Sequence, residues 1–213
     1  MRYHVRQLIF FHSLRADIVL LFSCRIVTGN AQGIEVNKDK FVQTELFIDQ
    51  VRSYNNVGST SVTEYGNGFR LYGEEITVKD SEASWNDQRG LIINGNGSGT
   101  TNVDLKGTNY FRHNGKNGLV LSGDASSSLK GTLTVYGKVN IYGNPAGFRL
   151  AKTAEIAVEV KKGGSLLSCN NPNTDIRNDN DSTTFAGNGY TCDNTFPASG
   201  KPLPVCDPCP LCN

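Results

Sequence analysis

Pairs of apolar residues separated by one polar residue recur along the middle of the chain. One set lies ten or eleven residues before an Asn and comprises Leu46/Ile48, Ile76/Val78, Val103/Leu105 and Leu133/Val135. A second set follows a Gly and comprises Phe69/Leu71, Leu91/Ile93, Leu119/Leu121 and Phe148/Leu150. A spacing of two residues is the period of a strand with one buried face, and Gly or Asn interrupts each run before a helical stripe can form. The pattern predicts short strands separated by turns.

These strands belong to a repeat. The first pairs begin at residues 46, 76, 103 and 133, and a fifth repeat starts with Ile156/Val158, so that successive repeats are 23 to 30 residues long. Repetition at this length is typical of a solenoid, in which each coil buries its inner face only against its neighbours. The inward columns that we predict are Leu46–Ile76–Val103–Leu133–Ile156, Ile48–Val78–Leu105–Val135–Val158, Phe69–Leu91–Leu119–Phe148, Leu71–Ile93–Leu121–Leu150 and Ala83–Phe111–Ile141. Segments 57–66, 94–102 and 122–132 are predicted to be loops on one side.

An Asn and a Gly mark the same turn of each repeat. We expect the Asn side chains to hydrogen bond to their counterparts one coil above and below, and the Asn backbone to take the left-handed conformation. The residues of this predicted ladder are Asn56, Asn86, Asn114 and Asn144. The Gly residues that precede the second strand are predicted to give the backbone the freedom to turn. They are Gly68, Gly90, Gly118 and Gly147.

This order of strand, Asn, Gly and second strand resembles the right-handed parallel β-helix proteins of the pectate-lyase-like superfamily, over roughly residues 40 to 168. The fold class that we predict is therefore all-β: a right-handed parallel β-helix of about five coils with a Cys-rich, irregular C-terminal tail. The resemblance leaves the activity open, because the superfamily includes polysaccharide lyases, glycoside hydrolases, epimerases and non-enzymatic surface proteins.

The repeats divide the chain into three parts. Residues 36–168 form the predicted β-helix domain, residues 169–213 a Cys-rich tail or cap, and residues 1–35 a leader or uncertain start. Apolar stretches at 8–11 and 18–22 follow Arg2 and Arg6, as in a signal peptide, but Arg15 and Asp17 interrupt them. A signal peptide, a faulty or truncated start and a folded cap remain alternatives. No run reaches the roughly 18 apolar residues of a membrane helix, so no membrane span is predicted.

Five of the six cysteines lie in the last 45 residues, which suggests a disulfide-tied tail in an oxidising compartment. The disulfide candidates are Cys169, Cys192, Cys206, Cys209 and Cys212, and Cys169–Cys192 is the pair that we expect. Zinc and iron–sulfur clusters need four ligands, and the terminal run offers three, so no metal is predicted there. A truncated, longer Cys-rich region is the other alternative.

Two further features bear on location and partners. Asn96 and Asn180 stand in Asn-x-Ser triplets and are candidates for glycosylation in a secretory route. Together with the cysteines they favour a secreted or cell-surface protein. The net charge is +1, which provides no field to attract nucleic acid, and no nucleic-acid partner is expected.

The catalytic constellations of the superfamily are not evident. Its lyases hold calcium with Asp and Glu beside an Arg or Lys base, and its hydrolases use closely spaced Asp residues. Asp80, Glu82 and Asp87 lie in one predicted coil, where calcium is possible, although solvated surface carboxylates are the simpler interpretation. Arg112 and His113 are the one place where a cation adjoins an imidazole. We assign no catalytic residue and no cofactor other than this possible calcium.

Aromatic residues near the Asn positions suggest binding instead. Tyr54 and Tyr142 both stand two residues before a ladder Asn, and Trp85 and His113 stand one residue before. Outward rings on neighbouring coils could stack, together with Arg112, against the apolar faces of sugar rings. Scattered surface aromatics are also common and need no function.

Two functions remain open. The first is a secreted or cell-surface β-helix scaffold that binds glycans or forms part of an extracellular matrix, without catalysis. The alternative is a polysaccharide lyase or glycoside hydrolase, or a fragment of one, that acts on an acidic polysaccharide. About five coils is short for a catalytic member of the superfamily, which favours the scaffold. The oligomeric state is not predicted.

Overall fold

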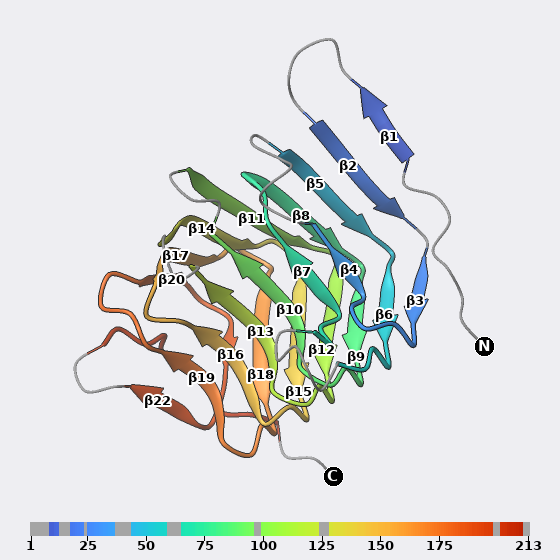
Figure 1. Ribbon diagram of the computed structural model, residues 1–213. Helices are drawn as coiled ribbons and strands as arrows, with labels where there is room; N and C mark the ends of the chain where they lie inside the picture. The colour runs from blue at the N-terminus through green and yellow to red at the C-terminus, as the bar shows by residue number, and fades with distance from the viewer. Residues whose placement is uncertain are drawn as a thin grey trace.

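The computed structural model describes residues 9–12, 18–23, 25–36, 44–58, 65–95, 99–123, 128–197 and 201–210. Within these ranges the chain forms strands, turns and loops and contains no helix (Figure 1). The strands stack into three sheets, and the predicted all-β parallel solenoid of about five coils is confirmed. Four described strands before these coils and three after them continue the stack.

Each coil contributes one strand to each sheet. Sheet A has eight strands, and their order is β1 (Ile9–His12), β2 (Ile18–Ser23), β5 (Thr44–Asp49), β8 (Glu75–Lys79), β11 (Thr100–Lys106), β14 (Leu129–Val135), β17 (Ala154–Val160) and β20 (Thr184–Gly187). Sheet B has seven: β3 (Ile26–Thr28), β6 (Arg52–Tyr54), β9 (Glu82–Ser84), β12 (Thr108–Arg112), β15 (Lys138–Tyr142), β18 (Ser165–Cys169) and β21 (Tyr190–Thr191). Sheet C also has seven: β4 (Ile34–Glu35), β7 (Phe69–Leu71), β10 (Arg89–Asn94), β13 (Asn117–Ser122), β16 (Ala146–Leu150), β19 (Thr174–Asn178) and β22 (Thr195–Pro197).

All described strand pairs are parallel except β1 with β2. β2 pairs with β5 from Ile18 opposite Thr44 to Ser23 opposite Asp49. In the structure, therefore, part of the segment 1–35 extends sheet A at its N-terminal edge. The described ranges contain no helix, and therefore none that is long and apolar enough to cross a membrane.

The apolar columns run through the centre of the coils. The two columns of sheet C are confirmed over their whole predicted length, and so is the column Ala83–Phe111–Ile141 in sheet B. In sheet A the columns are confirmed as far as Leu133 and Val135. The next predicted pair, Leu133 with Ile156, is wrong by two residues. Leu133 pairs with Val158, and Ile156 pairs with Gly131. A shift of two keeps the same face inward, so alternation alone cannot detect it.

The segments predicted as loops are shorter than expected. Residues 100–102 belong to β11 and residues 129–132 belong to β14, and both are paired in register with each other. Their alternation is carried by Thr and Gly as well as apolar residues, which concealed the strand in the sequence. Residues 59–64, 96–98 and 124–127 of these segments lie outside the described ranges.

A row of buried Asn side chains lies in the turn between sheets B and C. Asn86 donates from Nδ2 and from its backbone N–H to Oδ1 of Asn114, at 2.9 and 3.1 Å. The same two bonds link each Asn to the next along the series Asn56, Asn86, Asn114, Asn144 and Asn171. Since every amide in the row points the same way, the bonds polarise one another in one direction.

The left-handed backbone conformation belongs to the residue before each ladder Asn. Positive φ angles occur at Asn55, Trp85, His113, Gly143 and Asn170, so the prediction that the Asn itself is left-handed is wrong. The Asn side chain must point into the coil to reach its neighbour. The bend therefore falls one residue earlier, where the side chain points outward.

The Gly residues of the turn are required for space. A Cβ on Gly90 would lie 2.6 Å from the carbonyl oxygen of Gly118 and 2.9 Å from Nδ2 of Asn114. Gly68, Gly118 and Gly147 are crowded in the same way. These four residues have no positive φ, so the predicted role in freeing the backbone is wrong and close packing against the Asn row takes its place.

Two disulfides, Cys169–Cys209 and Cys192–Cys206, fasten the segment 201–210 to the last coils. The predicted pair Cys169–Cys192 is therefore wrong. Spacing along the chain does not specify connectivity. Here Cys169 and Cys192 each bond to a cysteine of segment 201–210 and not to one another. Cys24 and Cys212 lie outside the described residues.

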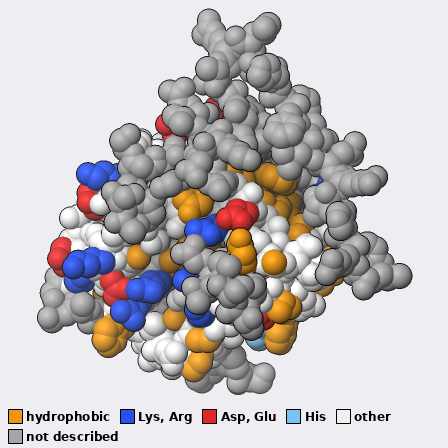
Figure 2. Space-filling view, viewed as in Figure 1, with side chains coloured by type: hydrophobic (Ala, Val, Ile, Leu, Met, Phe, Trp, Pro, Cys, Tyr) orange, Lys and Arg blue, Asp and Glu red, His pale blue; other side chains and the backbone are white. Residues whose placement is uncertain are grey.

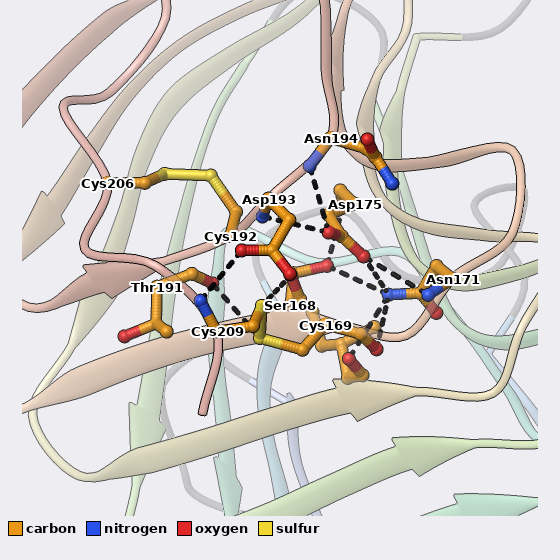
Figure 3. The surroundings of a disulfide bond; sticks show 11 residues. Ser168, Cys169, Asn171, Asp175, Thr191, Cys192, Asp193, Asn194, Cys206 and Cys209 are labelled. Atoms are coloured by element: carbon orange, nitrogen blue, oxygen red, sulfur yellow. Dashed lines mark hydrogen bonds between the residues drawn. A yellow bond between two sulfur atoms is a disulfide. The ribbon is translucent and has the colours of Figure 1, made fainter. Parts of the chain in front are cut away.

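Asp175 ends the Asn row beside these disulfides (Figure 3). Its Oδ1 accepts from N and Nδ2 of Asn171 at 3.2 and 2.9 Å, and its Oδ2 accepts from the backbone N–H groups of Asp193 and Asn194 at 3.0 and 3.1 Å. The residue is 1% exposed. A buried carboxylate is thus matched by four N–H donors, which a neutral amide could not satisfy as well.

Candidate functional site

The outer face of sheet B carries a group of rings and one guanidinium that we call the aromatic platform, consisting of Trp85, Tyr110, Arg112, His113 and Tyr142. Arg112 pairs with Tyr142 on the next strand, while Trp85 and His113 follow their strands in the turn. Trp85 is 59% exposed and Tyr110 is 37% exposed. Stacked coils are about 4.8 Å apart, so residues at one register position of neighbouring coils come into contact.

Trp85 is held flat by His113. The two ring centroids are 4.4 Å apart at an interplanar angle of 15°, and the edge of Tyr142 meets His113 at 5.5 Å between centroids. Gly143 makes room for the imidazole, because a Cβ there would lie 2.7 Å from Cε1 of His113. The large Trp ring is therefore exposed and at the same time fixed in orientation.

Arg112 is fixed by a carboxylate and two rings. Its Nε donates to Oε1 of Glu82 at 2.8 Å, its Nη2 is 2.8 Å from the same oxygen, and its Nη1 donates to the hydroxyl of Tyr142 at 2.7 Å. The guanidinium carbon lies 5.5 Å from the Tyr110 ring centroid and 5.8 Å from that of Tyr142. The hydrogen bond to Glu82 raises the pKa of Arg112 above its ordinary value, although partial burial opposes this. Arg112 is thus held in one orientation as the positive member of an ion pair with Glu82.

The structure brings four of the five predicted binding residues together: Trp85, Arg112, His113 and Tyr142. Tyr54 lies in the column of Arg112 but two coils away, with Ser84 between them. Sequence reasoning missed Tyr110 and the pairing of Glu82 with Arg112. Tyr110 stands two residues before Arg112, so strand alternation would have placed it on the same outer face.

The three carboxylates considered for calcium have separate partners. Glu82 binds Arg112, Asp80 accepts from the backbone N–H of Thr108 at 2.8 Å, and Asp87 accepts from that of Gly58 at 2.9 Å. Calcium binding stays an untested prediction.

Among the described residues, one group of side chains is close enough together to be considered as metal ligands. It consists of Asp175, Asp193 and Cys209. Cys209 is in a disulfide, and the oxygens of Asp175 accept hydrogen bonds from backbone and amide N–H groups (Figure 3). Asp193 Oδ1 accepts from the backbone N–H of Cys209 at 2.8 Å. This arrangement is accounted for by the hydrogen bonds that close the end of the solenoid.

The second glycosylation candidate is not at the surface. Asn180 is buried, and its Nδ2 donates to the carbonyl oxygen of Lys152 at 2.6 Å. A glycan on this nitrogen would have to displace that bond. Asn96 lies outside the described residues.

The charged groups on the face shown in Figure 2 alternate in sign, with Lys and Arg beside Asp and Glu. Elsewhere in the described structure, Arg149 and Arg177 both bind Asp179, with N···O distances of 2.9 and 2.7 Å. Burial acts to raise the pKa of Asp179, but the hydrogen bonds from Arg177 and Arg149 outweigh it and lower the pKa.

Comparison with known proteins gives no relative: no family model, no curated protein and no solved structure matches the chain. The predicted membership of the pectate-lyase-like superfamily is therefore unsupported beyond the shared type of fold.

Proposed function

We propose that the protein is an extracellular β-solenoid scaffold that binds glycans on the aromatic platform. The two disulfides are compatible with an oxidising, extracellular environment. The observation that carries the binding proposal is the exposed ring of Trp85, kept flat by its stack on His113.

The platform has the two components that sugar recognition needs. The face of Trp85 offers an apolar plane for the C–H groups of a pyranose ring. Arg112 and Glu82, held beside it, offer a donor and an acceptor for hydroxyl or carboxylate groups. Because these side chains are already fixed in the free protein, binding costs little conformational entropy.

A panel of immobilised acidic and neutral polysaccharides, with and without calcium, tests the proposal when retention and chain cleavage are both scored. We expect retention without cleavage, and affinity about tenfold weaker for Trp85→Ala, which corresponds to about 1.4 kcal/mol. Tyr136→Ala is the matched control, since Tyr136 is 47% exposed and precedes β15, whose far end carries Tyr142 of the platform. Equal losses for the two variants, or no retention at all, would refute the platform. Cleavage would favour the enzyme alternative.

A further inference from the structure

Within the described residues, sheet A ends at each side in a strand with one unpaired edge. Among the described strands, β1 pairs only with β2 and β20 only with β17, and they lie at opposite ends of the stack (Figure 1). An unpaired edge presents backbone N–H and C=O groups that can pair with another strand.

Residues 201–210 add a bridge at the edge of sheet B, whereas no described strand pairs with the outer edge of β20. Asp207 donates its N–H to the carbonyl oxygen of Tyr190 at 2.8 Å and accepts from the N–H of Cys192 at 3.0 Å, which adds a short bridge beside β21. Beside β20 there is instead an open pocket of about 440 Å³. Its apolar lining comes from Phe185, Tyr190, Leu203, Pro204 and Val205.

This pocket lies at the end of an inward column. Val158 pairs with Phe185, which is the last described residue of that column and one wall of the pocket. Burial raises the pKa of Tyr190, on another wall, to about 12, in keeping with its apolar surroundings. Val205 at the rim is 94% exposed. The apolar lining of the pocket therefore suits an inward apolar side chain from one additional strand.

The two edge strands themselves lack the charged residues and Pro that commonly prevent such pairing. Natural sheets protect their edges with charged residues, Pro or a covering segment. The sequence of β20 is Thr-Phe-Ala-Gly and that of β1 is Ile-Phe-Phe-His, so neither contains Lys, Arg, Asp, Glu or Pro.

We propose that copies of this chain associate head to tail, with β1 of one copy added to β20 of the next. A second copy fits better than an unrelated peptide because both unpaired edges belong to one sheet, which then continues from copy to copy. The two contacting surfaces differ, so each added copy leaves one β1 and one β20 free, and the assembly is open-ended.

Sedimentation velocity of the full chain over a concentration series tests this. The average mass of the wild-type protein rises with concentration, whereas Ala186→Lys, which places a charge on the β20 edge, stays monomeric alone. When it is added to wild type it caps one end of each assembly and lowers the average mass. Ala157→Lys is the matched control, because it makes the same change at an exposed position of the interior strand β17. Thermal unfolding shows that each variant is folded.

The double variant Phe10→Lys/Phe11→Lys blocks the other edge. Each blocked protein alone is monomeric, and an equimolar mixture of the two forms dimers and nothing larger, because each retains one intact edge. A monomeric wild type at every concentration overturns the proposal. So does an Ala157→Lys variant that loses association as fully as Ala186→Lys, or a mixture of the blocked proteins that stays monomeric.

Discussion

At the scale of single residues, the fold depends on polar side chains that are buried and hydrogen bonded. Asn114 accepts from Asn86 and donates from Nδ2 to Oδ1 of Asn144 and to the carbonyl oxygen of Ala83, at 3.1 Å in both cases. Its side chain is 2% exposed. Burial of these groups without partners would cost free energy, so each rung is stabilising only while the neighbouring rungs are present.

Asn114→Ala should lower the free energy of unfolding by about 2 to 4 kcal/mol, since it leaves buried donors and acceptors unpaired in the coils on both sides. Chemical denaturation measures this difference. The control is Asn173→Ala, at an exposed turn position, where a change below about 0.5 kcal/mol is expected. Similar losses in the two variants would show that the Asn row contributes no special stability.

The same scale explains which site residues could be predicted. Trp85, Arg112, His113 and Tyr142 were placed together because their distances from the ladder Asn are similar in successive repeats. Glu82 was considered with the carboxylates rather than with Arg112. A single sequence does not indicate which charged neighbour a long guanidinium side chain will contact.

At the scale of elements, strand alternation predicted the columns well and the turns less well. The turn between sheets B and C combines two features: a left-handed residue such as His113 and a Gly such as Gly118 that lies against the next coil. Alternation also could not choose between Ile156 and Val158 as the partner of Leu133, because both face inward. The register between β14 and β17 depends on all the residue pairs along the two strands, from Leu129 with Ala154 to Val135 with Val160.

Gly90→Ala tests the close packing of this turn. A Cβ at this position would force apart the carbonyl of Gly118 and the amide of Asn114, and we expect a loss of about 1 to 3 kcal/mol in unfolding free energy. In Gly99→Ala the nearest atom is the side-chain oxygen of Glu74 at 3.4 Å, so the change should stay near 0.5 kcal/mol or less. Equal stability of Gly90→Ala and wild type would contradict the packing role.

At the scale of the whole molecule, the interior is continuous from coil to coil while its two ends differ. At the C-terminal end, Asp175 closes the Asn row and two disulfides fasten the segment 201–210 over sheet B. This closure could not be predicted, because the pairing of Cys169 with Cys209 depends on where the chain crosses the end of the stack. The repeats predicted the body of the solenoid, since a repeated pattern carries its own register.

The central functional claim is that glycans bind against Trp85, and its fluorescence tests this most directly because Trp85 is the single Trp of the chain. A polysaccharide that the protein retains should change the emission of Trp85 in a saturable way, with the same midpoint as binding measured by retention. A polysaccharide that is retained at saturation but leaves the emission unchanged would contradict the account, because the exposed ring would then be outside the contact.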